Sequence, residues 1–326
     1  MAATEPPAAD LTPAGRTPGA AERGGGSPSV TARRRRVHRL RGRDRVTVAL
    51  MVTVPTLLVV GLVWLPAIAT VLLSFTRWTG IGGLGTIEWI GTTNYVNVFT
   101  NYPPFVPAME HNLLWLAVLF LVATPFGMFL AVLLDKEIKG SRFYQTAIYL
   151  PVVLSLALIA FIWQLFYSTD QGLLNAVFHT NVDWYGDSSI NIWAVLVASS
   201  WRHVGYIMLL YLAGLKGVDP SLREAAAVDG ASEVTTFFRV VFPVLRPINV
   251  IVLVITVIEA LRAFDIVWVV NKGRNGLELI SALVTQNVVG EASRIGFGSA
   301  LATIMLLISL VFIAIYLVTV MREDKP

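Results

Sequence analysis

Residues 221–247 read SLREAAAVDGASEVTTFFRVVFPVLRP, a charged and polar segment between two nearly unbroken apolar runs. A simple connection needs only about five residues. This segment is much longer, and it carries the signals of two short helices joined at Asp229 and Gly230. The sequence on both sides of this segment indicates which role such a helical connection has.

The first predicted helix begins near Ser221. A Ser at this position caps a helix, and Glu224, three residues later, completes a capping box. Ala225, Ala226 and Ala227 favour helix. Gly230 then ends it, because Gly adopts backbone conformations that a Cβ disfavours.

The second predicted helix begins at Ser232, another N-cap residue. Its apolar residues fall at helical spacings: Val234, Phe237, Phe238, Val241 and Phe242. Pro243 and Pro247 end it before the next apolar run. The pattern predicts a helix-turn-helix with one apolar face, for which a purely interfacial, amphipathic role is one interpretation.

The composition is that of a membrane protein. Hydrophobic residues make up 55% of the chain and charged residues 14%, against about 45–50% and about 25% in soluble domains. About 20 apolar helical residues cross a bilayer. Runs without charge lie between Arg45 and Arg77, His111 and Asp135, Arg142 and Asp170, and Arg294 and Arg322. Two further runs, about 190–215 and 247–270, contain charges, so the sequence predicts an all-α membrane protein with six transmembrane helices.

Several chemistries are excluded by what the sequence lacks. The chain has no Cys, so it has neither disulfides nor thiolate sites. Its four His residues are scattered, and it has no G-x-x-x-x-G-K-[ST] phosphate loop. We therefore expect no metal site, no cofactor bound by this chain, no catalytic residues and no enzymatic activity.

Basic residues predict the orientation of the spans. They are concentrated directly before the first apolar run, from Arg33 to Arg45, which indicates a topology signal and contact with membrane lipids rather than with nucleic acid. If the N-terminus is inside, most of the 25 Lys and Arg residues lie in inner segments. The outer segments then hold Arg77, Lys272, Arg274 and Arg294. The positive-inside rule thus places both termini and residues 221–247 in the cytoplasm.

Both ends of the chain are predicted to lie outside the transmembrane domain. Residues 1–45, rich in Ala, Pro and Gly ahead of the Arg cluster, are predicted to form a disordered cytoplasmic tail, and 322–326 a short cytoplasmic end. A cleavable signal peptide is an alternative, since Ala67-Ile68-Ala69 follows an apolar run. That run is longer than the usual 7–15 residues, which disfavours cleavage.

The outer segment 77–110 is rich in aromatic residues and proline, including Trp78, Tyr95 and Tyr102. Aromatic side chains gather at membrane interfaces because they have an apolar body and a polar edge. This composition favours an interfacial, folded-back loop over a direct ligand site.

Charged residues inside two predicted spans pose a choice between structure and function. Ionisable groups cost roughly 2.5–3.5 kcal/mol at the centre of a membrane helix, so they face a bundle interior or an aqueous path. Glu259, Arg262 and Asp265 are spaced so that neighbours can pair along one side of a helix. They form either a self-neutralising network or part of an aqueous path, and Arg202 poses the same choice. The candidates for the path are Arg202, Tyr206, Glu259, Arg262, Phe264, Asp265 and Trp268.

The spacing within 221–247 resembles the EAA loop of ABC-importer permeases. That pattern is E-A-A-x3-G-x9-I-x-L-P. This chain has Glu224-Ala225-Ala226, Gly230, Val240 and Phe242-Pro243 at the same spacing, with two apolar-for-apolar replacements. The segment also lies between predicted spans four and five, as it does in that family.

Flanking segments resemble the carbohydrate branch of these permeases, the maltose-type and glycerol-phosphate-type proteins. Residues 149–175 are similar to their third helix in carrying Pro151, Trp163 and the turn Gly172–Asn175. AFDIVWVV, residues 263–270, is similar to the F-D-x-[VI]-[YW]-V segment that closes their fifth helix. Residues 271–276 depart from the Gly-Gly-Pro-Gly turn of that family. The resemblance covers about 46–321.

The resemblance implies a type I ABC importer permease fold, with 219–243 as a coupling loop that docks on a separate ATPase subunit. Glu224 would be its charged anchor, Ala225 and Ala226 its small face, and Asp229 with Gly230 its turn. The implied partners are a second permease in a heterodimer, two ATP-binding subunits that hold ATP and Mg, and an extracytoplasmic substrate-binding protein. The implied location is the bacterial cytoplasmic (inner) membrane, crossed several times.

The sequence thus predicts a permease subunit of an ATP-driven importer of a sugar or oligosaccharide. A permease of the same fold for another solute, such as a glycerol-phosphate diester or an amino acid, is an alternative, because only the outer segments distinguish these. A stand-alone secondary transporter or channel is a different class. It is disfavoured because the internal repeat common in such folds is not visible.

Overall fold

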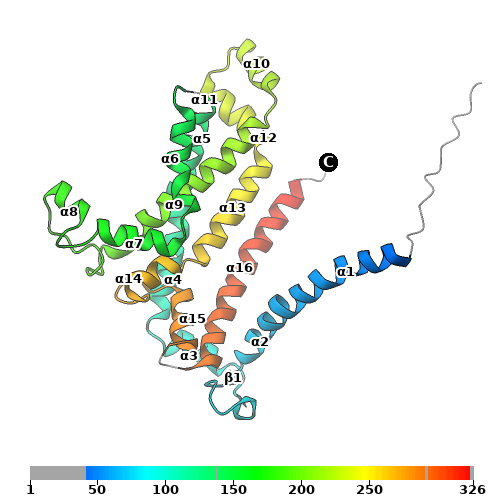
Figure 1. Ribbon diagram of the computed structural model, residues 1–326, viewed down its shortest axis with the longest axis vertical. Coiled ribbons are helices and arrows are strands. Elements are labelled where there is room, and N and C mark those ends of the chain that lie inside the picture. The colour runs from blue at the N-terminus through cyan, green and yellow to red at the C-terminus, as the bar shows by residue number, and fades with distance from the viewer. Residues whose placement is uncertain (1–41, 137, 291–292, 324–326) are drawn as a thin grey trace, which may run out of the picture. The chain divides into compact units, whose positions relative to one another are not determined.

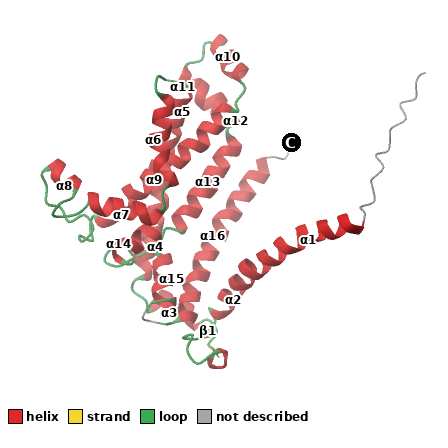
Figure 2. Ribbon diagram, in the orientation of Figure 1, coloured by secondary structure: helices red, strands yellow, loops and turns green. Residues whose placement is uncertain are grey.

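The computed structural model describes residues 42–136, 138–290 and 293–323 (Figure 1). Within them nearly all regular structure is helical, and β1 and β2 are two residues long each (Figure 2). Most of the predicted tail and of the C-terminal end lie outside the described residues. Helix α1 begins at Gly42, so the last four residues assigned to the disordered tail are helical, a correction of that boundary.

The elements follow in chain order. The helices before residue 190 are α1 (Gly42–Val59), α2 (Leu65–Leu73), α3 (Thr93–Thr100), α4 (Phe105–Val118), α5 (Thr124–Asp135), α6 (Ser141–Val153), α7 (Leu156–Phe166) and α8 (Leu173–Phe178). Those after it are α9 (Asn191–Lys216), α10 (Pro220–Val228), α11 (Glu233–Thr236), α12 (Phe242–Val244), α13 (Arg246–Leu261), α14 (Asp265–Asn271), α15 (Ile280–Val288) and α16 (Ile295–Glu323). Short π or 3-10 turns are η1 (Val60–Trp64), η2 (Leu84–Thr86), η3 (Leu119–Ala123) and η4 (Phe237–Val241), and the strands are β1 (Thr76–Arg77) and β2 (Glu88–Trp89).

Long apolar helices dominate, as the sequence predicts. Four helical segments are long and apolar enough to cross a membrane: Arg45–Leu73, Phe105–Asp135, Asn191–Lys216 and Ile295–Ala314. Two bent pairs could supply further spans, Ser141–Val153 with Leu156–Phe166 and Glu233–Val244 with Arg246–Asn271. The described residues therefore hold up to six spans, which agrees with the prediction of an all-α membrane protein.

The predicted third span is two helices and not one. Helices α6 and α7 meet at an angle of 105°. Ser155 begins α7, because its side chain accepts a hydrogen bond from the Leu158 N–H at 3.2 Å. The backbone of Leu154 and Ser155 is extended, with ψ of 147° at both, so the α6 helix cannot continue into α7.

The predicted fifth span is interrupted as well. The helical segment that ends at Val244 and the one that begins at Arg246 differ in direction by 77°. Pro243 and Pro247 flank this bend, in agreement with the prediction that they end the second helix of the loop. A second break, not predicted, lies at 262–264, where α13 has ended and α14 has not yet begun.

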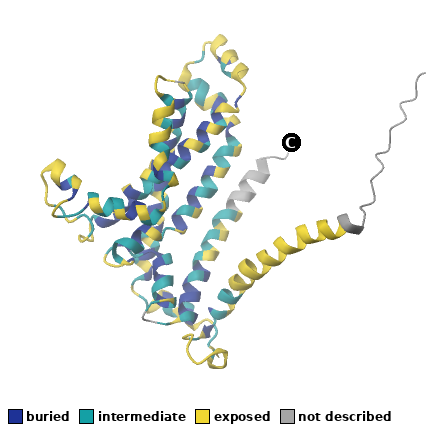
Figure 3. Cartoon of the chain, in the orientation of Figure 1, coloured by how far each residue is buried: buried dark blue, intermediate teal, exposed yellow. Residues whose placement is uncertain are grey.

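Close backbone approaches hold the central helices together. A Cβ on Gly127 of α5 would lie 2.8 Å from the Val204 carbonyl oxygen of α9, and one on Gly205 would collide with the Ile148 carbonyl of α6. Small residues permit such contacts between membrane helices. Buried residues accordingly follow α9 and its neighbours, whereas α8 and α10 are mostly exposed (Figure 3).

Helix α10 and the pair β1–β2 lie at opposite ends of these helices (Figure 1). The strands are antiparallel, with Thr76 opposite Trp89 and Arg77 opposite Glu88. Helix α3 and the first turns of α16 pack beside β1 and α2. We call this end, which the charge pattern predicts to be outside, the outer end.

Candidate functional site

The predicted first helix of the polar loop is α10, but its cap differs from the prediction. Asp219 is the N-cap residue: its Oδ1 accepts from the Ser221 N–H at 2.9 Å, and Pro220 occupies the first helical position. The expected Ser221–Glu224 capping box is therefore wrong. Pro is favoured at a first helical position because no N–H partner is needed there, which is the signal that would have identified Asp219. Hydrogen bonds from the backbone and the side chain of Ser221 lower the pKa of Asp219.

Helix α10 ends in a Schellman motif centred on Gly230. The Ala231 N–H donates to the Ala226 carbonyl at 3.0 Å, and the Gly230 N–H donates to the Ala227 carbonyl at 3.1 Å. Gly230 has a φ of +76°, in the left-handed region. The expectation that Gly supplies the turn between the two helices is confirmed in its backbone geometry.

The other predicted coupling residues lie on different faces of α10. Glu224, Ala225 and Asp229 are exposed, whereas Ala226 is buried against the rest of the chain. Ala226 thus does not contribute to an outward-facing small surface. Among the described residues, the Glu224 carboxylate has neither an ion-pair partner nor a side-chain hydrogen bond, so this charge is available to another molecule.

Ion pairs tie the loop to the end of α5. Asp135, the last residue of α5, has a buried side chain, and its Oδ2 accepts from Arg223 Nη1 of α10 at 2.8 Å. Lys216 at the end of α9 lies 3.5 Å from the other carboxylate oxygen. Lys136 contacts Glu233 of α11 at 2.5 Å and lowers the pKa of that carboxyl. The hairpin is therefore held by charges at the end of α5, and Lys216 of α9 shares the Asp135 carboxylate with it.

The second helix of the loop is capped as predicted. Ser232 accepts from the Thr235 N–H at 3.3 Å. The helix is not regular, because the π turn η4 separates α11 from α12. Val241 is buried, while Val234 and Phe238 are exposed, so the apolar residues do not form one buried face.

A second candidate site is a cavity of about 250 Å³ between α9 and the break at 262–264, which we call the central cavity. Its lining consists of Trp115, Leu156, Ser199, Arg202, Ile258, Glu259, Arg262, Ala263, Phe264, Asp265 and Ile266. Five predicted path residues are among these. Tyr206 and Trp268 are not.

The charges of the central cavity pair between helices and not along one. Arg202 Nη1 of α9 donates to Glu259 Oε1 of α13 at 3.0 Å, and His203 Nδ1 lies 2.5 Å from Glu259 Oε2. The expected pairing among Glu259, Arg262 and Asp265 is wrong, since α13 ends at Leu261 and the helical spacing is lost. Arg262 and Asp265 are exposed and have no ion-pair partner among the described residues.

His203 is a structural residue that the path prediction left out. Its side chain is 1% exposed, and its Nε2 lies 3.2 Å from Thr124 Oγ1 of α5 and 3.4 Å from Thr256 Oγ1 of α13. These contacts join α5, α9 and α13 close to Glu259. The sequence signal for this residue is a His beside an Arg within an apolar run. Its partners lie on other helices, so no local sequence pattern identifies them.

The two predicted residues outside the lining have other surroundings. Trp268 stacks on Phe264, with ring centroids 5.1 Å apart, and Lys272 lies 5.2 Å from the Trp268 ring. Tyr206 packs against the cluster formed by α5, α9 and the start of α13. Trp268 therefore supports a cavity residue, whereas Tyr206 belongs to the core.

The turn Gly172–Asn175 also has a physical explanation. Asn175 Oδ1 accepts from Trp184 Nε1 at 2.9 Å, and its Nδ2 donates to the Val182 carbonyl at 2.9 Å. A Cβ on Gly172 would collide with the Ser168 carbonyl. This turn shapes the outer loop that contains α8.

A family model described as "Binding-protein-dependent transport system inner membrane component" matches residues 46–323. The chain is 32% identical over 268 residues to the probable ABC transporter permease protein YurN of Bacillus subtilis, a match that covers 79% of this chain and 90% of YurN. It is 33% identical over 254 residues to the xylose/arabinose import permease protein XacH of Haloferax volcanii, covering 75% of this chain and 78% of XacH.

A solved structure supports the same fold. A bacterial ABC transporter involved in the import of the acidic polysaccharide alginate contains a chain with a TM-score of 0.74 and 20% sequence identity. The match covers 87% of this chain and 97% of that one.

Proposed function

The chain belongs to the family of binding-protein-dependent transport system inner membrane components, and from this premise we propose that it is one permease of an ATP-driven carbohydrate importer. As a permease of this family it is a transport component and not an enzyme. We propose a second permease, two ATPase subunits that bind ATP and Mg, and an extracytoplasmic binding protein as its partners. The proposed location is a bacterial inner membrane with both termini in the cytoplasm.

The observation that carries this proposal is the exposed carboxylate of Glu224, which has no partner among the described residues, on a helix tied to α5 by Arg223 and Asp135. A carboxylate in this setting can hold a cation of an ATPase subunit. Ala225 beside it permits close approach, and the Schellman turn at Gly230 fixes where α10 ends. In this proposal α10 is the docking element, and Asp229 lies at its rim.

The central cavity is the proposed part of the solute path contributed by this chain. Arg262 and Asp265 are charged, exposed and without partners among the described residues, so their polar groups are free to contact hydroxyl groups. Phe264 offers an aromatic face in the same lining. We assign Arg202 and Glu259 a structural role instead, because they satisfy each other across α9 and α13.

A carbohydrate is the favoured solute class because relatives such as XacH and the arabinooligosaccharide permease AraP of Bacillus subtilis carry sugar names. AraP is 28% identical to this chain over 256 residues. One relative supports a different class of solute. The osmoprotective compounds uptake permease protein GgtC of Synechocystis is 32% identical over 254 residues.

The proposal is tested in proteoliposomes that hold this chain with its partner subunits and the loaded binding protein. Glu224→Gln removes only the charge. Losing one member of a partly desolvated charge pair costs about 2–5 kcal/mol, so affinity for the ATPase subunits should fall at least tenfold and ligand-stimulated ATP hydrolysis should fall with it.

Glu110→Gln is the matched control, because Glu110 is an exposed carboxylate near the outer end. It should leave ATPase affinity and ligand-stimulated hydrolysis unchanged. Uptake that proceeds without ATP, or equal behaviour of the two variants, would contradict the proposed role of α10.

A further inference from the structure

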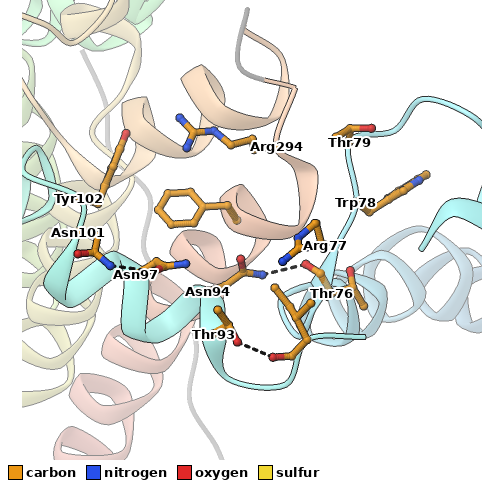
Figure 4. Close-up of a pocket in the computed structure, with 12 residues that line it drawn as sticks. Thr76, Arg77, Trp78, Thr79, Thr93, Asn94, Asn97, Asn101, Tyr102 and Arg294 are labelled. Carbon is orange, nitrogen blue, oxygen red and sulfur yellow. Dashed lines mark hydrogen bonds between the residues drawn. The ribbon is translucent and has the colours of Figure 1, made fainter. Parts of the chain in front are cut away.

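A second cavity, of about 430 Å³, lies at the outer end and shares no lining residue with the central cavity (Figure 4). We call it the outer cavity. It is lined by Thr76, Arg77, Trp78, Thr79, Ile90, Thr93, Asn94, Asn97, Asn101, Tyr102, Arg294 and Phe297. Its volume is within the range of about 300–1,000 Å³ that is typical of small-molecule sites.

The walls of the outer cavity are cross-linked, so the cavity is built before any ligand arrives. Asn94 of α3 is buried, and its Nδ2 donates to the carbonyls of Ser74 at 2.8 Å and Thr76 at 2.9 Å. On the opposite wall the Gly296 N–H donates to the Trp78 carbonyl at 3.1 Å. These bonds fix α3, β1 and the start of α16 relative to one another. A rigid site loses little entropy when it binds.

The lining offers positive charge from Arg294, just before α16, and amide groups from Asn97 and Asn101 on the α3 side. The Arg294 guanidinium lies over the Phe297 ring, 5.5 Å from its centroid, and no carboxylate pairs with it among the described residues. Asn101 Nδ2 donates to Asn97 Oδ1 at 3.0 Å, which leaves Asn97 Nδ2 and Asn101 Oδ1 without side-chain partners in the same part of the chain. The outer cavity is thus lined by a donor, an acceptor and a guanidinium that has no carboxylate partner among the described residues (Figure 4).

Aromatic faces complete the lining. Tyr102 and Phe297 meet edge to face, with centroids 5.0 Å apart. Tyr102 Oη accepts from Asn287 Nδ2 at 3.0 Å, which fixes the Tyr102 ring and leaves its own O–H free to donate. Rings of this kind pack against the C–H faces of a sugar, while amides and guanidinium bind its hydroxyl and carboxylate oxygens.

The geometry points to a binding site for a saccharide unit that carries a carboxylate, a uronic acid, in the outer cavity. Arg294, placed over the buried Phe297 ring, would bind the carboxylate, Asn97 and Asn101 the ring hydroxyls, and Tyr102 the ring face. The choice of a carbohydrate rests on the proposed function. The cavity favours a free ring over an acidic side chain of a docked protein, because such a side chain would need the cation alone and neither the amides nor the aromatic walls.

Isothermal titration of the full-length chain in detergent tests this assignment, with sodium D-glucuronate, D-glucose and sodium acetate as probes. Glucuronate should bind at least tenfold more tightly than either of the others, since each of these lacks one half of the recognised chemistry. Arg294→Gln should weaken glucuronate binding at least tenfold. Asn97→Ala should weaken glucuronate and glucose alike.

The matched control is Arg274→Gln, because Arg274 is also exposed and predicted to be outside but lies outside the cavity lining. It should bind glucuronate as the unchanged chain does. The assignment is overturned if glucuronate does not bind, if acetate binds equally well, or if the two Arg variants lose equal affinity. A separate ATP-hydrolysis assay with the binding protein tests the alternative that the cavity is a protein contact. The assignment is also overturned if Arg294→Gln leaves glucuronate binding unchanged and impairs only stimulation by the binding protein.

These titrations contain no ATP and no ATPase, so they do not depend on Glu224. A chain that fails to bind glucuronate but needs Glu224 for ligand-stimulated ATP hydrolysis refutes only the outer site. A chain that binds glucuronate in the stated pattern but is indifferent to Glu224→Gln refutes the coupling role and leaves the outer site in place.

Discussion

Replacing Gly230 by Ala isolates the conformational strain at the end of α10. No atom of the protein lies within 4 Å of the position that an added Cβ would occupy, so the substitution causes no collision. Its cost is confined to the backbone, which has a φ of +76°. For a residue with a Cβ, the left-handed conformation costs about 1–2 kcal/mol. The two hydrogen bonds of the Schellman motif should therefore open more often, by a factor of roughly 5–30.

Amide hydrogen exchange of the full-length chain measures this opening directly. The Gly230→Ala variant should lose protection at Ala231 and through the last turn of α10, while α9 and α13 keep theirs. Gly230→Asn should lie between Ala and Gly, because Asn tolerates the left-handed region better than other residues with a Cβ. If α10 is the docking element, ligand-stimulated ATP hydrolysis should fall in the same order.

Gly83 provides the control, because it has a φ of +75° and likewise has no atom within 4 Å of an added Cβ. Gly83→Ala should reduce protection near η2 at the outer end and leave α10 and ATP hydrolysis unchanged. Unaltered exchange in Gly230→Ala would refute the strain argument. Altered exchange with normal ATP hydrolysis would refute the docking role of α10.

Two further predictions concern charge. Glu259→Gln leaves Arg202 without its carboxylate, and the Arg202 Nε has no hydrogen-bond partner among the described residues. Unfolding free energy should therefore fall by roughly 2–3 kcal/mol. The exposed Arg262→Gln should instead lower uptake with a change in stability within about 0.5 kcal/mol. Thermal unfolding and uptake assays separate the two, and reduced stability in both variants would contradict the roles assigned. The lowered pKa of Asp219 means that its cap stabilises α10 above pH 3.8 and is lost as pH falls through the lower folded value. Amide exchange in the first turn of α10, corrected for the intrinsic rate, should rise on acidification. Asp219→Asn should abolish this pH dependence. A pH dependence that persists in the variant would show that another group titrates.

The parts of the fold that depend on local pattern could be predicted from the sequence. Uncharged runs identify the long helices because burial in a membrane requires them. Gly230 and Ser232 were placed correctly, since a turn with positive φ and an N-cap each depend on one residue. The cap differs from the predicted Ser221 because two nearby positions, 219 and 221, both carry side chains that can cap a helix.

The parts that depend on contacts between distant segments could not be predicted. Nothing in the local sequence shows that Glu259 selects Arg202 and His203 over Arg262, because that choice depends on how α9 packs against α13. The break at 262–264 likewise ends a helical pattern without Gly or Pro. The aromatic residues of 77–110 indicated a loop at the interface, while the cavity they help to form also needs α16.

The ties around Asp135 explain how a movement of α10 can reach the central cavity. The Asp135 carboxylate at the end of α5 pairs with Arg223 of α10 and with Lys216 of α9, so one group of α5 connects the hairpin and α9. Helices α5 and α9 are in close contact at Gly127, where an added Cβ would lie 2.8 Å from the Val204 carbonyl oxygen. A displacement of α10 should therefore move α5 and α9 together, as packed elements shift as units. The bend at Leu245 and the break at 262–264 remain the places where the chain can change direction, so Arg262 and Asp265 should move relative to Glu259.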